Sequence, residues 1–91
     1  MDGMEFNVDQ LTFPLRWHGR LVMKAGMGSM EESVARIFLS LGVTEGEVVY
    51  ANKSSNGTYE TWRLSGMVHD LAMLRALFTA LEALPGVRML I

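Results

Sequence analysis

The chain has 91 residues, of which 49% are hydrophobic and 20% are charged, and its formal net charge is −2. This composition is typical of one globular domain with one hydrophobic core and excludes a disordered chain. The absence of cysteine excludes disulfides, thiolate metal sites and thiol catalysis, and the negative charge argues against bulk electrostatic binding to nucleic acid.

Residues 1–11 are predicted to be a poorly ordered lead-in, followed by a single domain over residues 12–91. The first ten residues contain Asp2, Glu5 and Asp9 but no basic residue and no long apolar run, so they lack the features of a signal peptide. No apolar run in the chain approaches the roughly 20 residues that cross a bilayer. We therefore expect a cytoplasmic protein that does not contact a membrane.

The first predicted strand follows Phe13-Pro14. Apolar side chains at the odd positions alternate with polar side chains at the even positions as far as Lys24, which is the period of a strand with one buried face. Trp17 belongs to the buried set, while Arg16, His18 and Arg20 belong to the polar set. These three polar side chains should therefore point away from the core.

A flexible turn, Ala25–Ser29, precedes a predicted helix over residues 30–41. Ser29 and Glu32 have the spacing of a capping box, and Gly42 fits the left-handed position that ends a helix. Gly26, Gly28 and Ser29 form a candidate effector turn, because amides at a helix N-terminus can bind an anion. The alternative is an ordinary turn, since the motif lacks the third glycine of a dinucleotide site.

The second and third strands, over residues 47–53 and 58–68, are predicted to form a hairpin. The dipeptide Asn56-Gly57 favours a two-residue type I′ turn. The predicted cross-strand pairs are Lys53 with Glu60 as an ion pair, Ala51 with Trp62, and Tyr50 with Arg63. In this register Trp62 faces the core, whereas a slip of one residue would turn it to the other face.

A second helix begins after His69-Asp70, with Asp70 as its N-cap, and Pro85-Gly86 ends it before a short strand over residues 87–91. The predicted order of elements is therefore βαββαβ. Right-handed crossovers then give an α+β, ferredoxin-like fold. It consists of a four-stranded antiparallel sheet with strand order 4-1-3-2 and two helices on one face.

Several short motifs resemble the YbeD-like family of small bacterial proteins, which are known as lipoate regulatory proteins. The motifs are Phe13-Pro14, Arg20-Leu21, Ser54-Ser55-Asn56-Gly57-Thr58-Tyr59, Leu77-Phe78 and Val87-Arg88-Met89-Leu90. The resemblance covers about residues 13–91 and departs from the family pattern at Lys53 and Met23. It implies an ACT-like fold, a cytoplasmic location and a regulatory role, with no catalytic residue to carry over.

The strand pattern also predicts a basic, aromatic surface on the sheet face away from the helices. Its candidate residues are Arg16, His18, Arg20, Tyr50, Tyr59 and Arg63, with Arg88 nearby. Such a face can bind a partner protein, a second copy of the chain, RNA or an anionic ligand, or it can simply be solvated. The signature of RNA-recognition domains is absent, which makes nucleic acid the least favoured of these partners.

The remaining polar residues do not predict catalysis or a cofactor. The two histidines have no acidic cluster at metal-ligand spacing, and Ser54 and Ser55 fit turn chemistry better than a nucleophile. The prediction is thus a non-enzymatic regulatory or protein-interaction domain that docks through its open sheet face or an alanine-rich helix face. Its partner would be another protein or a second copy, and the alternatives are an effector sensor at Ala25–Ser29 and an RNA binder.

Overall fold

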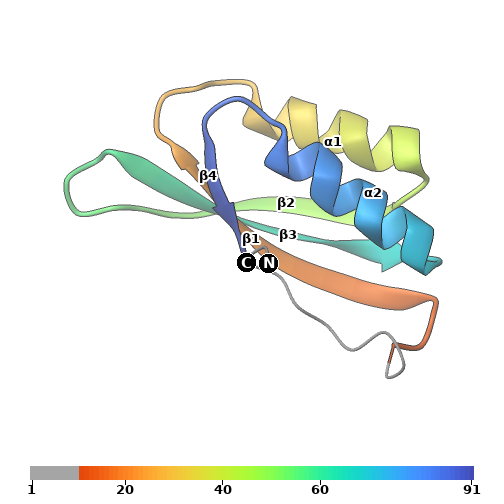
Figure 1. The fold of residues 1–91 in the computed structure, drawn as a ribbon. Helices are drawn as coiled ribbons and strands as arrows, with labels where there is room; N and C mark the ends of the chain where they lie inside the picture. The colour runs from red at the N-terminus through yellow and green to blue at the C-terminus, as the bar shows by residue number, and fades with distance from the viewer. Residues whose placement is uncertain (1–10) are drawn as a thin grey trace.

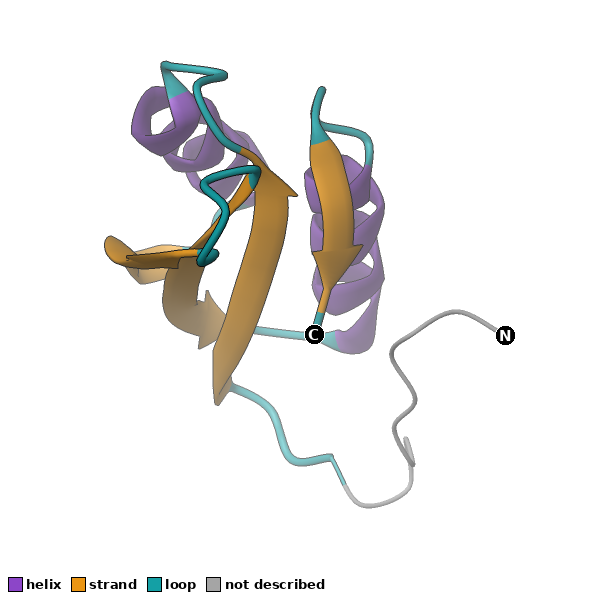
Figure 2. Cartoon of the chain, turned by 90° about the vertical axis from the view of Figure 1, so that its left-hand side faces the viewer, coloured by secondary structure: helices purple, strands orange, loops and turns teal. Residues whose placement is uncertain are grey.

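The computed structural model describes residues 11–91, which form six elements in the order βαββαβ (Figure 1). The elements are β1 (Leu15–Lys24), α1 (Met30–Leu41), β2 (Thr44–Lys53), β3 (Tyr59–Val68), α2 (Leu71–Glu82) and β4 (Val87–Leu90). The strands form one antiparallel sheet in the order β2-β3-β1-β4, which is the predicted order read from the opposite edge. Both helices lie on one face of this sheet, so the predicted fold class is confirmed (Figure 2).

Most of the predicted lead-in, residues 1–11, lies outside the described residues, and its lack of order stays a prediction. Leu11 and Phe13 are described, and both pack against the core from the start of β1. Neither α1 nor α2 has the length and apolar character that a helix needs to cross a bilayer.

The core lies between the helices and the inward face of the sheet. Trp17 and Leu21 of β1 are 6% and 0% exposed, and they pack with buried side chains of both helices. Gly19 lies between them on the same face, where a Cβ atom would stand 2.3 Å from the Trp17 ring. Because glycine has no Cβ, the indole can lie directly against the strand.

The second indole also lies on the inward side. Trp62 of β3 is paired with Leu21 across the sheet, is half-buried and packs against the core. The prediction that both tryptophans share the helix-covered face is therefore confirmed. It follows that the alternate residues of β1 and β3 are left on the face that neither α1 nor α2 covers.

The hairpin turn is longer than predicted. Gly57 has a φ of 76°, but Asn56 does not have the positive φ that a type I′ turn requires. The backbone amide of Gly57 instead donates to the carbonyl of Ser54 at 2.9 Å, and the amide of Ser54 donates to the carbonyl of Tyr59 at 2.8 Å. The loop thus spans residues 55–58 and keeps its centre between Asn56 and Gly57, so the pairing next to it is unchanged.

A bulge at Ala51 then shifts the register of β2. Asn52 pairs with Thr61 as predicted, but the register shifts by one residue across Ala51. As a result Tyr50 pairs with Trp62, and their rings meet edge to face with centroids 5.3 Å apart. The predicted pairs of Tyr50 with Arg63 and of Ala51 with Trp62 are wrong, because Ala51 is the extra residue of the bulge and turns Tyr50 to the helix side of the sheet.

The ion pair predicted beside the turn is also wrong, although Lys53 does lie opposite Glu60. The Glu60 carboxylate accepts a hydrogen bond from the indole Nε1 of Trp62 at 3.3 Å. Both residues lie on the same strand two positions apart, so their side chains share a face. The ion pair that the structure does show among residues 11–91 joins Arg16 to Glu45 instead.

The two helices begin in different ways. Ser29 has a left-handed backbone with φ 52° and makes no side-chain cap bond, so the predicted capping box is wrong. Asp70 is the predicted cap of α2, and its Oδ1 accepts from the backbone amide of Met73 at 2.8 Å. Gly42 has the predicted left-handed conformation at the end of α1, with φ 83°.

Candidate interaction face

The open face is the side of the sheet opposite the helices. Arg16, His18 and Arg20 of β1 are exposed on it, as is Arg63 of β3, and half-buried Tyr59 lies on the same side of β3. The structure therefore brings together five of the six residues predicted for this surface. Tyr50 is the exception, since the bulge at Ala51 places it beside Trp62.

Arg20 and Arg63 lie directly opposite each other at the centre of the open face. The amide and the carbonyl of Arg20 both bond to Ile91, each at 2.9 Å. Since both backbone groups are directed at that neighbour, Arg20 and Arg63 form a non-hydrogen-bonded pair of the antiparallel ladder. Side chains approach most closely at such pairs, and like charges there are destabilising.

Among the described residues, neither of these guanidinium groups forms an ion pair. Arg16 differs, because its Nη2 donates to Oε1 of Glu45 at 2.8 Å. The positive charge of β1 is thus neutralised at the Arg16 end and uncompensated at Arg20. The centre of the open face, at Arg20, therefore carries an unpaired positive charge that its Arg16 end lacks.

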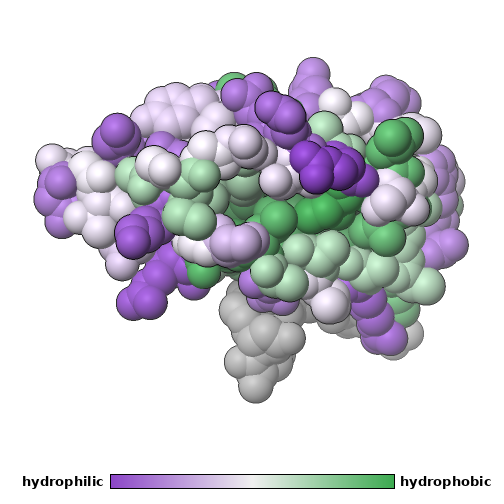
Figure 3. All heavy atoms as spheres, turned by 90° about the horizontal axis from the view of Figure 1, so that it is seen from above, coloured by the Kyte–Doolittle hydropathy of each residue, from purple (hydrophilic) through white to green (hydrophobic). Residues whose placement is uncertain are grey.

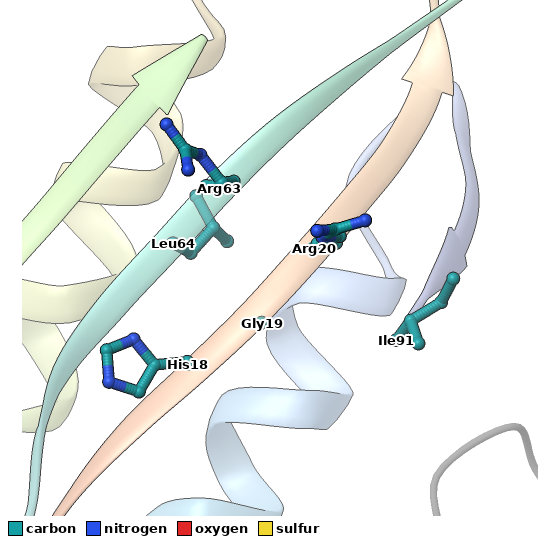
Figure 4. A pocket seen from close by; sticks show the side chains of 6 residues that line it. All are labelled: His18, Gly19, Arg20, Arg63, Leu64 and Ile91. Atoms are coloured by element: carbon teal, nitrogen blue, oxygen red, sulfur yellow. The ribbon is translucent and has the colours of Figure 1, made fainter. Parts of the chain in front are cut away.

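The two unpaired arginines border a shallow depression of about 450 Å³ (Figure 4). It is lined by His18, Gly19, Arg20, Arg63, Leu64 and Ile91. Gly19 and Leu64 are buried, so they form its floor. Figure 4 shows Arg20 and Arg63 on neighbouring strands of the sheet, with the helices behind.

Exposed apolar side chains surround this depression. Val49, opposite Arg63, is 44% exposed, and Met89, opposite Val22 on β1, is 48% exposed. Ile91, beside Arg20, is 57% exposed. The centre of the open face therefore combines two cations with an apolar border.

The two ends of the open face differ in their charges. Toward the hairpin, the Arg88 guanidinium lies over the Tyr59 ring, 5.9 Å from its centroid. At the other end, a second depression of about 430 Å³ is lined by Arg16, His18, Glu45, Gly46, Glu47 and Ser65. Two carboxylates accompany the single arginine at this end, so it is more acidic than the centre.

The candidate effector turn is left-handed at three positions, with φ 81° at Gly26, 68° at Gly28 and 52° at Ser29. A cavity of about 210 Å³ lies beside it, lined by Met23, Met27, Gly28, Ser29, Met30, Ser33, Leu84 and Pro85. This set contains no charged side chain, and Glu31 and Glu32 occupy the first turn of the following helix. Both features disfavour a bound anion there.

The serines and histidines show no catalytic arrangement. The Ser54 hydroxyl donates to Oδ1 of Asn56 at 2.9 Å and accepts from the amide of Tyr59 at 3.0 Å, as predicted for turn chemistry. The His69 ring lies 3.3 Å from the Thr44 hydroxyl. Within residues 11–91, no three His, Asp or Glu side chains lie close enough together to hold a metal ion.

The helix side of the molecule presents a different surface. Figure 3, seen from the side of α1 and α2, shows hydrophobic residues gathered over the middle, with hydrophilic residues around them. A hollow of about 350 Å³ on this side is lined by Ser33, Arg36, Ile37, Ser40 and Leu84. Leu39 of α1 is 82% exposed, which marks the outer side of that helix.

A family model described as "Protein of unknown function (DUF493)" matches residues 9–91. The chain belongs to the DUF493 family. YbeD is also a member, so the predicted resemblance is confirmed at the level of the family. No protein with a curated description matches the chain.

Solved structures show what the DUF493 chain resembles in fold. The solution structure of protein HP0495 from H. pylori has a TM-score of 0.75 at 15% identity, covering 97% of each chain. A second solution structure of HP0495 from Helicobacter pylori has a TM-score of 0.62 at 16% identity, covering 87% of each chain. The ACT domain from GTP pyrophosphokinase of Chlorobium tepidum has a TM-score of 0.65 at 17% identity, covering 85% of this chain and 95% of that one.

Proposed function

We propose that this DUF493 protein is a non-catalytic regulatory domain of the cytoplasm that docks on a partner protein through its open sheet face. The observation that carries the proposal is the Arg20–Arg63 pair, which has no carboxylate partner among residues 11–91 and lies on the face that neither α1 nor α2 covers. A like-charge pair costs stability in the free protein. A partner that compensates the charge removes this cost.

The apolar border supports a protein as the partner. Val49, Met89 and Ile91 are each exposed by more than 40% around the two arginines. The core of a protein interface combines apolar side chains with arginine, and arginine is common among the residues that contribute most binding energy. The open face therefore has the amino-acid composition that is typical of a protein–protein interface.

The regulatory part of the proposal is supported by the fold. The chain resembles in fold the ACT domain from a GTP pyrophosphokinase, and the YbeD-like resemblance implies a regulatory role. The YbeD-like resemblance further implies a role in lipoate metabolism. Enzymes that attach or synthesise lipoate are accordingly the first partners to test.

The other candidate functions have less support in the described residues. A symmetric homodimer centred on Arg20 and Arg63 would bring two further guanidinium groups against the first two. An effector at the Ala25–Ser29 turn would occupy a cavity of about 210 Å³, which is smaller than most ligand pockets. RNA would meet Glu45 and Glu47 at one end of the face.

Site-specific photocrosslinking in the native cell tests the docking face. A photoreactive amino acid is introduced at Val49 on the open face, and at Leu39 on the outer side of α1 as the matched control. Both positions are exposed, at 44% and 82% respectively. We expect a discrete adduct with another protein from position 49 and none from position 39.

The mass of the adduct separates the outcomes. An adduct of twice the 10.2 kDa chain mass would replace the proposed partner by a second copy of the chain. Equal crosslinking from both positions, or none from position 49, would overturn docking through the open face. The adduct protein, once purified, should bind the wild-type chain directly.

A further inference from the structure

We infer that Arg20 and Arg63 together bind one carboxylate group, so that the docking segment of the partner presents an Asp or Glu side chain flanked by apolar residues. This inference rests on the proposed docking function and specifies its chemistry. It concerns the depression of Figure 4 and its apolar border, and no other part of the open face.

The positions of the two arginines favour a shared ligand. They form a non-hydrogen-bonded cross-strand pair, and both border the same depression of about 450 Å³. A guanidinium group presents a planar fork of donors that matches the two oxygens of a carboxylate. In Figure 4 the two guanidinium groups point to opposite sides of the depression, so a carboxylate between them would be held by one fork on each oxygen when both side chains turn toward it.

The local charges favour an anion over any neutral group. Among residues 11–91 neither guanidinium has an acidic partner, whereas Arg16 on the same strand is already paired with Glu45. A carboxylate between Arg20 and Arg63 would replace a repulsion with two attractions. No such gain exists at Arg16, so the site is confined to the centre of the face.

The surroundings favour a protein carboxylate over a nucleic-acid phosphate. A polyanion lying along the face would reach Glu45 and Glu47, which repel it. Base stacking would depend on Tyr59, and Arg88 already lies over that ring. A single carboxylate between apolar side chains avoids both problems, since Met89 and Ile91 offer exposed apolar contacts beside the arginines.

Peptide titration of the isotopically labelled full chain, followed by NMR, tests the ligand class. The probes are the peptide Gly-Ser-Leu-Glu-Leu-Ser-Gly, the same peptide with Gln in place of Glu, and hexauridylate RNA. We expect the Glu peptide to shift the side-chain Nε–H signals of Arg20 and Arg63. The Gln peptide should bind about ten- to a hundredfold more weakly, which corresponds to the loss of charge-assisted hydrogen bonds.

Three single variants test the residues: Arg20→Gln, Arg63→Gln and, as the matched control, Arg75→Gln. Arg75 is an exposed arginine of α2 on the helix side of the molecule. Either open-face variant should weaken binding of the Glu peptide at least about tenfold, while the control should bind as the wild type does. Unchanged backbone amide spectra outside the open face will show that each variant is folded.

The results that would overturn the carboxylate site are equal binding of the Glu and Gln peptides, tighter binding of the RNA, or no response to the Glu peptide. Retention of binding in both open-face arginine variants would overturn it as well. The crosslinking experiment keeps this failure separate from that of the proposed function. If Arg20→Gln and Arg63→Gln leave the adduct from position 49 intact, the face still docks but the carboxylate site is wrong.

Discussion

Like charges opposite each other in a sheet are usually avoided, and Arg20 and Arg63 lie in that arrangement at the point where side chains come closest. Their neighbour Arg16 is paired with a carboxylate. The pair is therefore expected to lower the stability of the free protein, and in the proposed function it provides the charge for docking. Binding and stability should respond in opposite directions when either arginine is neutralised.

Replacing Arg63 with Gln should raise the free energy of unfolding by about 0.2–1 kcal/mol, because it removes a cross-strand repulsion. Urea denaturation of the purified chain measures this change, with Arg75→Gln as a control that should leave the midpoint nearly unchanged. A loss of about 1 kcal/mol in Arg63→Gln would mean that this side chain stabilises the fold, and would contradict the cost assigned to the pair.

The alternation of β1 was sufficient to predict which of its side chains lie on the open face. Trp17 and Leu21 alternate with Arg16, His18 and Arg20, so the buried face of β1 is apparent from the residues alone. The position of Tyr50 was not predictable in this way. Residues 48–51 are apolar or aromatic at every position, so no alternation marks the bulge at Ala51. The position of Tyr50 becomes apparent only from the structure, where its ring packs on Trp62.

At the scale of the elements, the two helix starts show when a local motif is informative. Ser29 and Glu32 have capping-box spacing, but Ser29 follows two left-handed glycines and is itself left-handed, so its hydroxyl makes no cap bond. Asp70 has extended backbone, and its carboxylate reaches the amide of Met73. A capping motif thus forms a cap only where the preceding turn leaves the N-cap residue in an extended backbone conformation.

The caps should differ in their contribution to stability. Asp70→Ala is expected to lower the free energy of unfolding by about 1 kcal/mol, since a bonded N-cap is lost. Ser29→Ala should change it by less than about 0.5 kcal/mol, since no bond is lost. Thermal or urea unfolding of the two variants measures the difference. Equal losses would contradict the assignment of the single side-chain cap to α2.

In the hairpin, the sequence predicted the position of the loop but not its length. The Asn56-Gly57 signal located the centre of the loop, and this was enough to pair Lys53 with Glu60 and Asn52 with Thr61. It did not determine the loop length, because the Ser54 hydroxyl and the Asn56 amide oxygen bond within the loop and stabilise a wider turn. Side-chain hydrogen bonds of this kind compete with the tight turn that the dipeptide favours.

At the scale of the whole molecule, one core joins both helices to the sheet. Val34 and Phe38 of α1 and Leu77 and Leu81 of α2 belong to the same cluster as Leu21 of β1. The order of the strands and the helix-covered face were predictable, because short connections and right-handed crossovers leave few arrangements of βαββαβ. The sequence pattern did not reveal which arginines would lack an acidic partner, since Glu45 and Arg16 are 29 residues apart.

The shared core predicts cooperative unfolding. Differential scanning calorimetry should show one transition, with equal calorimetric and van't Hoff enthalpies and a heat-capacity change of about 1 kcal/mol/K. Neither helix can keep its apolar face buried after the other has left the sheet. Two resolved transitions would contradict a single core, because they would mean that parts of the domain unfold independently.

The irregularities of β2 have a consequence for self-assembly. This strand forms one border of the sheet, and its ladder is interrupted at Ala51 and again between Thr44 and Glu47, where Glu45 has a φ of 52°. An incoming strand from another molecule would find no long, straight row of free amides and carbonyls to extend. The irregular β2 edge therefore disfavours strand addition from a second molecule, although apolar side chains are exposed on the open face.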